Sequence, residues 1–264
     1  MGKIRVGVMG ACGKMGREIC SHILDDSELE LTAAIDVVNN GSKLGVLIGR
    51  PQTEILINNL HDALDAGNLD VLIDFTNAQA VLNNSPKVIA RGINLVIGTT
   101  GLSVEEVNHI ETMAEKHQVG VIAAPNFSIG AVLMIKFAKD AAQYFPHLEI
   151  IEKHHDQKLD APSGTAIKTL EEISKNRSKM QQGHKHEYEK IIGARGGDFE
   201  GIRVHSIRLP GLIAHQEVIF GGEGQILTIK HDSLSRDCFM PGILLAVKKV
   251  RNIKGLCYGL ENIL

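Results

Sequence analysis

The sequence predicts an α/β fold of two domains, one built on a parallel sheet and the other an α+β domain with a mixed sheet. In the first half of the chain, short apolar runs alternate with helical patterns, which is typical of a parallel sheet flanked by helices. Between residues 202 and 232, three runs alternate in polarity and are separated by glycine turns, which indicates antiparallel strands. The 264 residues leave room for two domains of about 100–150 residues each.

A glycine-rich turn joins the first predicted strand, residues 4–8, to a helix that begins near Met15. Its glycines, Gly10, Gly13 and Gly16, form a G-x-x-G-x-x-G pattern, which departs from the usual G-x-G-x-x-G. Glycine is needed where a pyrophosphate approaches the backbone more closely than a Cβ allows, and helix N–H groups attract phosphate charge. The turn predicts a nucleotide site, with a purely structural glycine turn as the alternative.

A carboxylate ends the second predicted strand, residues 29–35. Asp36 stands 20 residues after Gly16, where a dinucleotide-binding fold places the group that holds the adenosine ribose. This spacing makes the first domain Rossmann-like. A carboxylate there accepts hydrogen bonds from the ribose hydroxyls of NADH and repels a 2′-phosphate, and Val37 and Val38 offer it no cation. We therefore expect NADH to be preferred and NADPH tolerated, with Lys43 as the nearest downstream cation.

The remaining elements of the first half continue the alternation. Strands are expected at 71–75, 94–97 and 119–123, and helices at 78–90 and 104–116. Polar or glycine loops follow these strands, namely Asp74-Phe75-Thr76, Gly98-Thr99-Thr100-Gly101 and Pro125-Asn126-Phe127. Because the carboxyl ends of parallel strands lie along one edge, the loops predict one ligand crevice, with Thr99 and Thr100 placed to hydrogen-bond a carboxamide.

The second half changes character after a helix at 130–144. A strand at 148–152, a helix ending near Lys175 and a polar irregular stretch at 181–201 precede the three alternating strands. A helix at 241–250 follows, and the last segment, 256–264, is expected to pack on the first domain. The expected domains are 1–127 with 236–264 for dinucleotide binding, and 128–235 for substrate binding and oligomerisation.

The segment H-H-D-Q-K-L-D-A-P-S-G-T, residues 154–165, places two imidazoles and an ammonium before a helix start. Proline is excluded from a helix interior, and Ser163 suits a cap whose neighbouring N–H groups can bind an anion. A small dianion bound there would meet His154, His155 and Lys158. A capped surface loop is the alternative reading for any one of these residues taken singly.

Composition narrows the class of protein. Net charge is −3 with no basic stripe, so no nucleic-acid partner is expected, and no apolar stretch of about 18 residues predicts a membrane span. The four cysteines lack C-x-x-C spacing and suit a reducing compartment, so we expect a cytoplasmic protein. His184 and His186 have no third ligand at metal spacing, and no metal is predicted. Cys12, near a helix start, is expected to have a lowered pKa, with an inert thiol as the alternative.

The chain resembles the dihydrodipicolinate reductase family almost from end to end. The segments that carry the resemblance are G-A-C-G-K-M-G at 10–16, D-F-T at 74–76, G-T-T-G at 98–101, P-N-F-S-I-G at 125–130, H-H-D-Q-K-L-D-A-P-S-G-T-A at 154–166 and H-S-I-R-L-P-G at 205–211. The resemblance implies reduction of the cyclic, imine-type dicarboxylate 4-hydroxy-tetrahydrodipicolinate to tetrahydrodipicolinate with NAD(P)H, in lysine and diaminopimelate biosynthesis. It also implies a substrate domain that closes over the cofactor, and a homotetramer assembled through that domain's sheet.

The resemblance also implies roles for single residues. His154 corresponds to the catalytic donor/acceptor and Lys158 to the proton donor. With Ser163 of the turn included, the expected substrate-binding residues are His155, Ser163, Gly164 and Thr165. With the strand-end residues included, the expected cofactor-binding residues are Gly10, Ala11, Cys12, Gly13, Lys14, Met15, Asp36, Phe75, Thr76, Gly98, Thr99, Thr100, Ala124, Pro125, Asn126 and Phe127. Pro125 replaces the family's frequent alanine, so contacts there are expected to differ in detail.

Two other functions fit parts of this pattern. Another nicotinamide-dependent amino-acid dehydrogenase of the same layout would turn over an α-amino acid and would not need Lys158. A non-catalytic nucleotide sensor would need the glycine turn and Asp36, but it would have no use for the 154–165 segment.

Overall fold

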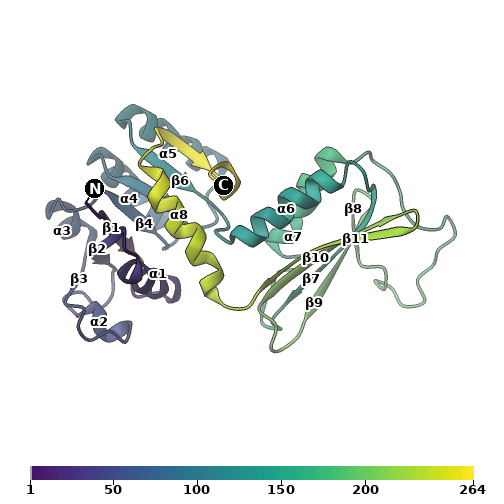
Figure 1. Cartoon of the computed structure of the whole chain (residues 1–264), viewed down its shortest axis with the longest axis horizontal. Coiled ribbons are helices and arrows are strands. Elements are labelled where there is room, and N and C mark those ends of the chain that lie inside the picture. Colours follow the sequence, from purple (N-terminus) through teal and green to yellow (C-terminus); the bar gives the residue numbers. More distant parts are fainter. Residues whose placement is uncertain (1) are drawn as a thin grey trace. The chain divides into compact units, whose positions relative to one another are not determined.

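The computed structural model describes residues 2–264, which form two compact units. The first unit consists of the chain up to Ile129 together with Phe239–Leu264, and the second is Gly130–Cys238 (Figure 1). The C-terminal segment therefore returns to the first unit, as the apolar end of the sequence predicted. Each unit has its own sheet and its own buried core.

The first unit is built on a seven-stranded parallel sheet in the order β12-β6-β5-β4-β1-β2-β3. The strands are β1 (Ile4–Met9), β2 (Leu29–Ile35), β3 (Ile57–Asn58), β4 (Val71–Asp74), β5 (Asn94–Ile97), β6 (Gly120–Ala123) and β12 (Gly255–Tyr258). The helices are α1 (Lys14–Asp25), α2 (Leu44–Leu47), α3 (Leu60–Asp65), α4 (Ala78–Ala90), α5 (Val104–His117) and α8 (Met240–Val250), with short 3₁₀ turns at Arg236–Phe239 and Leu260–Asn262.

The strand order places β1 at the centre of the sheet, and successive strands are added outward on either side of it. Helices α1 and α8 pack together on one face, whereas α4 and α5 pack together on the other (Figure 1). Since both faces are covered, β4 and β6 are buried throughout and read as continuous apolar runs. The direction of strand addition reverses between β1 and β4, which is where doubly wound sheets bind their ligands.

The second unit is built on a five-stranded mixed sheet in the order β11-β10-β7-β9-β8. Its strands are β7 (His147–His154), β8 (Gly197–Phe199), β9 (Ile202–Arg208), β10 (Ala214–Gly222) and β11 (Gln225–Ser233), and its helices are α6 (Ile129–Ala141) and α7 (Gly164–Asn176). Only the β7–β9 pair is parallel. The core combines apolar side chains from α6, α7 and one face of the sheet, with Phe220, Ile150 and Leu170 fully buried.

The ends of the second unit's elements were only partly predicted. Strand β7 runs two residues beyond the expected end at Glu152, so His154 is a strand residue rather than a loop residue. Helix α6 ends at Ala141, short of the expected Tyr144, and β8 lies within the stretch expected to be irregular. In the first unit, α2, β3 and α3 were not predicted, because elements of only two to six residues are too short to show a clear periodicity.

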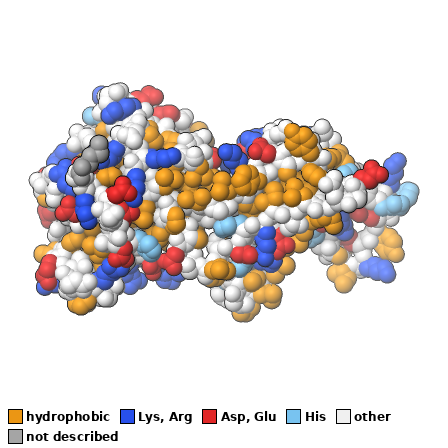
Figure 2. Space-filling model, viewed as in Figure 1, with side chains coloured by type: hydrophobic (Ala, Val, Ile, Leu, Met, Phe, Trp, Pro, Cys, Tyr) orange, Lys and Arg blue, Asp and Glu red, His pale blue; other side chains and the backbone are white. Residues whose placement is uncertain are grey.

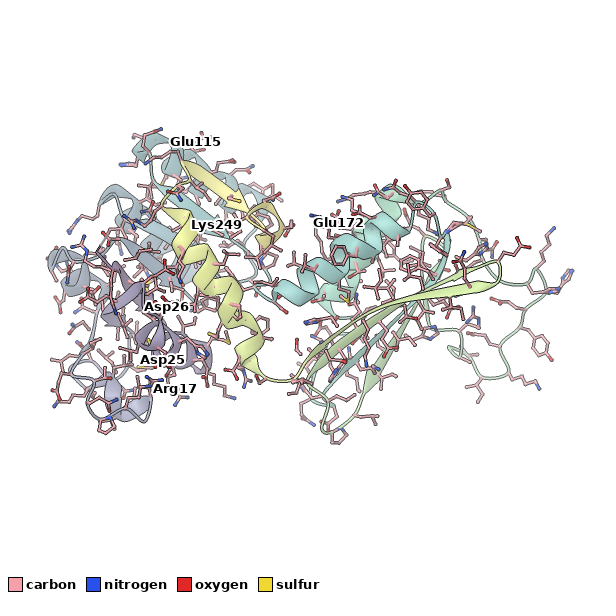
Figure 3. The ribbon with its side chains drawn as sticks, viewed as in Figure 1. Arg17, Asp25, Asp26, Glu115, Glu172 and Lys249 are labelled. Carbon is pink, nitrogen blue, oxygen red and sulfur yellow. The ribbon has the colours of Figure 1, made fainter. Side chains whose placement is uncertain are left out.

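Charged side chains of both signs are interspersed over the visible surface of each unit (Figure 2). On the second unit, hydrophobic side chains gather over α6, and Phe137 of this helix is about half exposed. An ion pair between Glu172 of α7 and Lys139 links α7 to α6 (Figure 3). Glu172 also pairs with Lys168 and Lys175 of its own helix. No helix among residues 2–264 is long and apolar enough to cross a membrane.

Candidate active site

The glycine turn after β1 leaves no room for side chains. Gly10 has a φ of +82°, and a Cβ on it would lie 2.7 Å from the carbonyl oxygen of Phe75. A Cβ on Gly16, in the first turn of α1, would lie 2.0 Å from the Gly10 oxygen, so loop and helix are in backbone contact there. Such a cradle of bare backbone at a helix start fits a dinucleotide phosphate, as the sequence predicted.

Asp36 lies against this turn. Its Oδ2 accepts a hydrogen bond from the Cys12 N–H at 2.8 Å, and its Oδ1 accepts those of Val37 at 2.8 Å and Val38 at 3.2 Å. The structure therefore brings Asp36 and the phosphate turn together, as a ribose bound beside a pyrophosphate requires. Lys43, the nearest downstream cation, is engaged elsewhere, because its Nζ lies 2.6 Å from Glu54 Oε2.

A buried carboxylate ties together the loops after β4 and β5. Asp74 Oδ1 accepts hydrogen bonds from the backbone N–H and hydroxyl of Thr76, at 3.0 and 2.6 Å, and a long one from the Thr99 hydroxyl at 3.4 Å. Its other oxygen is buried and has no hydrogen-bond partner among the described residues. Burial raises the pKa of Asp74, and the hydrogen bonds from Thr76 and Thr99 oppose that rise. The sequence placed Thr76 and Thr99 at the site but gave Asp74 no role.

Two aromatic rings, Phe75 and Phe127, lie in the loops that follow β4 and β6. A Cβ on Gly98 would lie 2.0 Å from the Phe75 ring, so only glycine permits that ring to lie flat against this loop. The Phe75 and Phe127 rings lie 5.8 Å apart. Ala11, Ala124 and Phe127 have buried side chains, so contacts that they make with a bound cofactor must come from their backbone. Pro125 and Thr100 are exposed.

In the second unit, the 154–165 segment begins at the end of β7 and is anchored by Glu152. This fully buried carboxylate accepts a hydrogen bond from His154 Nδ1 at 2.5 Å. Arg208, opposite His154 on β9, donates to both of its oxygens, at 2.7 and 2.9 Å. Glu152 also accepts the N–H of Ser163 at 3.2 Å and a hydrogen bond from the side chain of Ser206, its neighbour on β9.

The segment then enters α7 through the predicted cap. Ser163 is buried, and its hydroxyl accepts the N–H of Ala166 at 3.2 Å, which leaves the first-turn N–H groups of Gly164 and Thr165 for a ligand. A Cβ on Gly164 would meet nothing within 4 Å, so the approach to this turn is open. His155 is exposed, and Lys158 pairs with Asp160 at 2.6 Å.

Burial and neighbouring charges have opposing effects on the pKa values of His154 and Glu152. Burial lowers the pKa of His154, Glu152 raises it, and the nearby cations Lys158 and Arg208 lower it further. For Glu152, burial alone would raise the pKa, but hydrogen bonds from Arg208, Ser206 and His154 outweigh it and lower the pKa. Glu152 is therefore ionised, and His154 is neutral, at neutral pH.

Neither Glu152 nor Arg208 was predicted from the sequence as part of the site. The signal for Glu152 was present, since a residue two positions before His154 in a strand projects from the same face. Arg208 lies in the segment 205–211, but only the pairing of β7 with β9 reveals its partner.

The expected lowering of the Cys12 pKa was wrong. Burial raises the pKa of this thiol most; next, a hydrogen bond from Asn39 lowers it, Asp36 raises it and Arg17 lowers it. Loss of hydration of the thiol therefore outweighs the stabilisation that a helix N-terminus offers.

Two further histidines of the second sheet are held by carboxylates: His205 by Glu149 at 2.8 Å and His215 by Asp232 at 2.7 Å. His184 and His186 lie on an exposed loop with their rings 5.8 Å apart.

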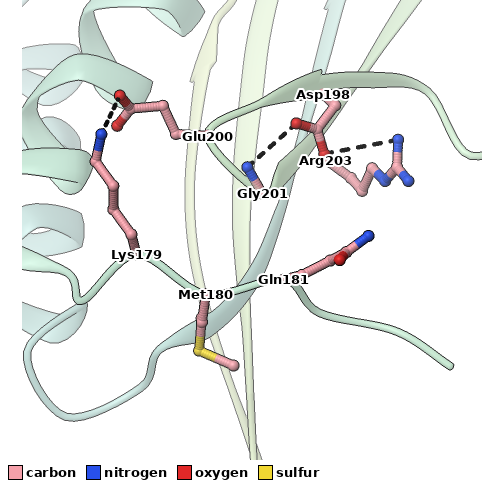
Figure 4. Close-up of a pocket in the computed structure, with 7 residues that line it drawn as sticks. All are labelled: Lys179, Met180, Gln181, Asp198, Glu200, Gly201 and Arg203. Carbon is pink, nitrogen blue, oxygen red and sulfur yellow. Dashed lines mark hydrogen bonds and ion pairs between the residues drawn. The ribbon is translucent and has the colours of Figure 1, made fainter. Parts of the chain in front are cut away.

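A pocket of about 610 Å³ lies elsewhere in the second unit (Figure 4). Its lining includes Asp198, which bonds the Gly201 N–H, and Lys179, which pairs with Glu200. Arg203 of this pocket lies opposite Glu149 in the β7–β9 strand pair. Glu149 is five residues before His154, a distance of roughly 16 Å along the strand. The pocket is therefore separate from the 154–165 segment.

A bare-backbone turn at a helix start with Asp36 beside it in the first unit, and an open helix start with an imidazole and an ammonium near it in the second, are features typical of a nicotinamide-dependent oxidoreductase. Residues 4–127 match the model "Dihydrodipicolinate reductase, N-terminus" and residues 130–264 match "Dihydrodipicolinate reductase, C-terminus". The chain belongs to the dihydrodipicolinate reductase family.

Individual relatives agree over their whole length. The chain is 53% identical to the 4-hydroxy-tetrahydrodipicolinate reductase of Desulfitobacterium hafniense (strain DSM 10664 / DCB-2), covering all of both chains. It is 55% identical to the enzyme of the same name from Syntrophomonas wolfei subsp. wolfei, covering 99% of both. Among solved structures, the dipicolinate-bound dihydrodipicolinate reductase of Paenisporosarcina sp. TG-14 is 45% identical, with a TM-score of 0.90 over 99% of this chain and 100% of that one.

Proposed function

We propose that the protein reduces 4-hydroxy-tetrahydrodipicolinate to tetrahydrodipicolinate with NAD(P)H, in the biosynthesis of lysine and diaminopimelate. The observation that carries the proposal is the 154–165 segment, in which an imidazole and an ammonium stand before the open first turn of α7. The family membership supports it, as do the names of the relatives that match over their full length. The solved relative's ligand, dipicolinate, supports a dicarboxylate as the kind of substrate.

The conversion releases the 4-hydroxyl group as water, and the unsaturated imine so formed takes up hydride on carbon and a proton on nitrogen. A reduced nicotinamide bound to the first unit would supply the hydride. The first-turn N–H groups of Gly164 and Thr165, with His155, bind one carboxylate of the substrate, because helix N-termini carry partial positive charge. Lys158 attracts the dianion and donates the proton, since an ammonium that leaves water becomes a stronger acid.

His154 completes the proton transfer. Its Nδ1 is occupied by Glu152, so Nε2 is the ring atom that can exchange a proton with the substrate. With its pKa lowered by burial, the imidazole is neutral at neutral pH and acts first as an acceptor.

The residues of the first unit favour NADH over NADPH in this proposal. Asp36 lies at the expected ribose position, and Val37 and Val38 follow it with largely exposed, uncharged side chains. Lys43, the cation that would have to pair with a 2′-phosphate, is bound to Glu54. The use of NADPH would require Lys43 to leave that ion pair, so NADPH is tolerated rather than preferred.

We further propose a cytoplasmic homotetramer assembled through the second unit's sheet. The support is the exposure of Ile226 and Leu227 on the edge strand β11, since such apolar edge strands are normally covered. All four cysteines are free, as in reducing compartments. Light scattering on the purified protein measures the assembly directly, and replacement of Ile226 by lysine is expected to reduce it.

A coupled assay tests the activity. Aspartate semialdehyde, pyruvate and a dihydrodipicolinate synthase generate the substrate, and consumption of reduced nicotinamide is followed in the presence of the purified chain. Consumption that depends on all components supports the proposal. Absence of consumption, together with oxidation of an α-amino acid by NAD, would instead identify an amino-acid dehydrogenase.

A further inference from the structure

Glu152 is the centre of a buried hydrogen-bond network that includes His154. Both residues belong to β7 and project from the same face of the strand, since they are two residues apart. The carboxylate is fully buried, whereas the His154 and Arg208 side chains that bond it are 14% and 18% exposed, so the network reaches the surface through the partners of Glu152 and not through Glu152 itself. Nothing in the proposed chemistry above requires Glu152 to touch the substrate.

Resting on the proposed function, we propose that Glu152 is a positioning residue that holds His154 in the Nδ1–H tautomer and presents Nε2 to the substrate. An ionised carboxylate only accepts hydrogen bonds, so Nδ1 carries a hydrogen whether the ring is neutral or protonated. Proton exchange is thereby confined to Nε2. Without this partner the two neutral tautomers would be similar in free energy, and part of the population would have no acceptor at Nε2.

Arg208 stabilises the ionised carboxylate of Glu152 in its buried position. Two charge-assisted hydrogen bonds, at 2.7 and 2.9 Å, compensate the loss of hydration that Glu152 suffers on burial. The same guanidinium donates to the carbonyl oxygen of Asp160 at 2.7 Å and so fixes the loop that carries Lys158. The network thus joins the imidazole to the loop of the proposed proton donor.

A further contact of Glu152 reaches the proposed substrate-binding turn. Its Oε1 accepts the Ser163 N–H, and Ser163 in turn caps α7. One carboxylate therefore sets the position of both the imidazole and the helix start, which explains why a buried charge lies at this point of the sheet.

The charged groups that act on His154 are Glu152 on its own strand, Arg208 on β9 and Lys158 on the following loop, with Asp160 paired to Lys158. On the other neighbouring strand, β10, the residue opposite is the uncharged Ala214. Glu152 is the only group in this set that raises the pKa of His154. Its neutralisation is expected to lower that pKa further.

The test compares Glu152→Gln with the wild-type enzyme. Glutamine keeps the shape but can donate as well as accept, so the fixed tautomer is expected to be lost. Long-range nitrogen-15 spectra of the imidazoles, with His154 assigned by its absence in His154→Ala, report the tautomer and the pKa. We expect a mixture of tautomers, a lower His154 pKa, a kcat about 10²-fold lower and a KM for NADH within about twofold of wild type.

Glu149 provides a matched control. It lies on the same strand and also binds a histidine and an arginine, His205 at 2.8 Å and Arg195 at 2.7 Å, but it is away from the 154–165 segment. Glu149→Gln is expected to perturb the His205 ring and to leave kcat and the His154 signals unchanged.

If Glu152→Gln is unstable because Arg208 is left without a counter-charge, the double variant Glu152→Gln with Arg208→Gln removes both charges and carries the same expectation for the tautomer. A fixed Nδ1–H tautomer in either variant would overturn the proposal, and so would a mixed tautomer with unchanged kcat. The proposed function fails separately, if the wild-type enzyme does not reduce the substrate in the coupled assay. Full activity of His154→Ala would overturn the positioning role while leaving the reductase activity in place.

Discussion

The ammonium of Lys158 and the carboxylate of Asp160 form an ion pair of 2.6 Å across two residues of the same loop. In the proposed reaction this ammonium must turn to the substrate nitrogen, so its ion pair with Asp160 has to give way when the substrate binds. The partly exposed position of both groups keeps the pair weak enough to exchange.

Lys158→Ala is expected to fold, to bind NADH normally and to lose about 10²–10⁴-fold in kcat, because the proton donor is removed. Steady-state rates with saturating substrate measure the loss, and NADH fluorescence measures cofactor binding. Lys185→Ala, a lysine on an exposed loop of the same unit, is the control and is expected to keep full activity. An unchanged kcat for Lys158→Ala would reject its assignment as the acid.

Thr165→Ala is expected to raise KM for the dicarboxylate more than it lowers kcat, because it removes a side chain from the carboxylate-binding turn rather than the proton donor. The Thr165 N–H remains in this variant, so the effect should be about tenfold or less. A fall in kcat without a change in KM would place Thr165 in the chemical step instead.

Val37→Arg is expected to move the preference toward NADPH. An arginine beside the ribose offers a bidentate partner to the 2′-phosphate, which Asp36 otherwise repels. The ratio of kcat/KM for NADH to that for NADPH is the quantity to measure, in wild type and variant. A wild-type preference for NADPH would mean that Asp36 does not contact the ribose as we propose.

Asp74→Ala is expected to weaken NADH binding by about tenfold, because the hydroxyls of Thr76 and Thr99 lose their common acceptor and the two loops separate. Equilibrium fluorescence titration measures the Kd. Asp70→Asn is the control. Asp70 lies at the opposite end of β4, where its carboxylate binds Arg5, so this substitution should lower stability without changing the affinity for NADH. Equal losses of affinity in both variants would argue for a general structural effect.

Glu172 predicts a pH dependence of stability. Hydrogen bonds from Lys175, and then from Lys168 and Lys139, lower its pKa from 4.5 to about 2. A carboxyl whose pKa is lowered by folding stabilises the protein fully above pH 4.5 and loses that contribution as the pH falls toward 2. Glu172→Gln should therefore cost about 1–2 kcal/mol at pH 7, allowing for solvent screening of the lysines, and progressively less in acid. Urea unfolding of the wild type and the variant, at pH 7 and in acid, measures this difference in the free energy of unfolding.

The sequence by itself determined most of the first unit. Helix α4 and strand β5 have the predicted bounds, and the alternation of buried runs with amphipathic ones allows only a parallel sheet with both faces covered. The glycine turn and Asp36 were also readable, because their spacing reflects local backbone geometry and the length of one βαβ unit. The short elements α2 and β3 were not, since their stability comes from contacts rather than periodicity.

Only the tertiary structure decided how the charged groups of the site are partnered. That Arg208 neutralises Glu152 depends on the pairing of β7 with β9, two strands separated by more than forty residues of chain. That the pKa of Cys12 is raised rather than lowered depends first on the burial of the thiol in the folded chain and also on the approach of Asp36 from the end of the next strand. Local patterns specify which residue types are present, but electrostatic interactions depend on distances in space, and long-range strand pairing sets those distances.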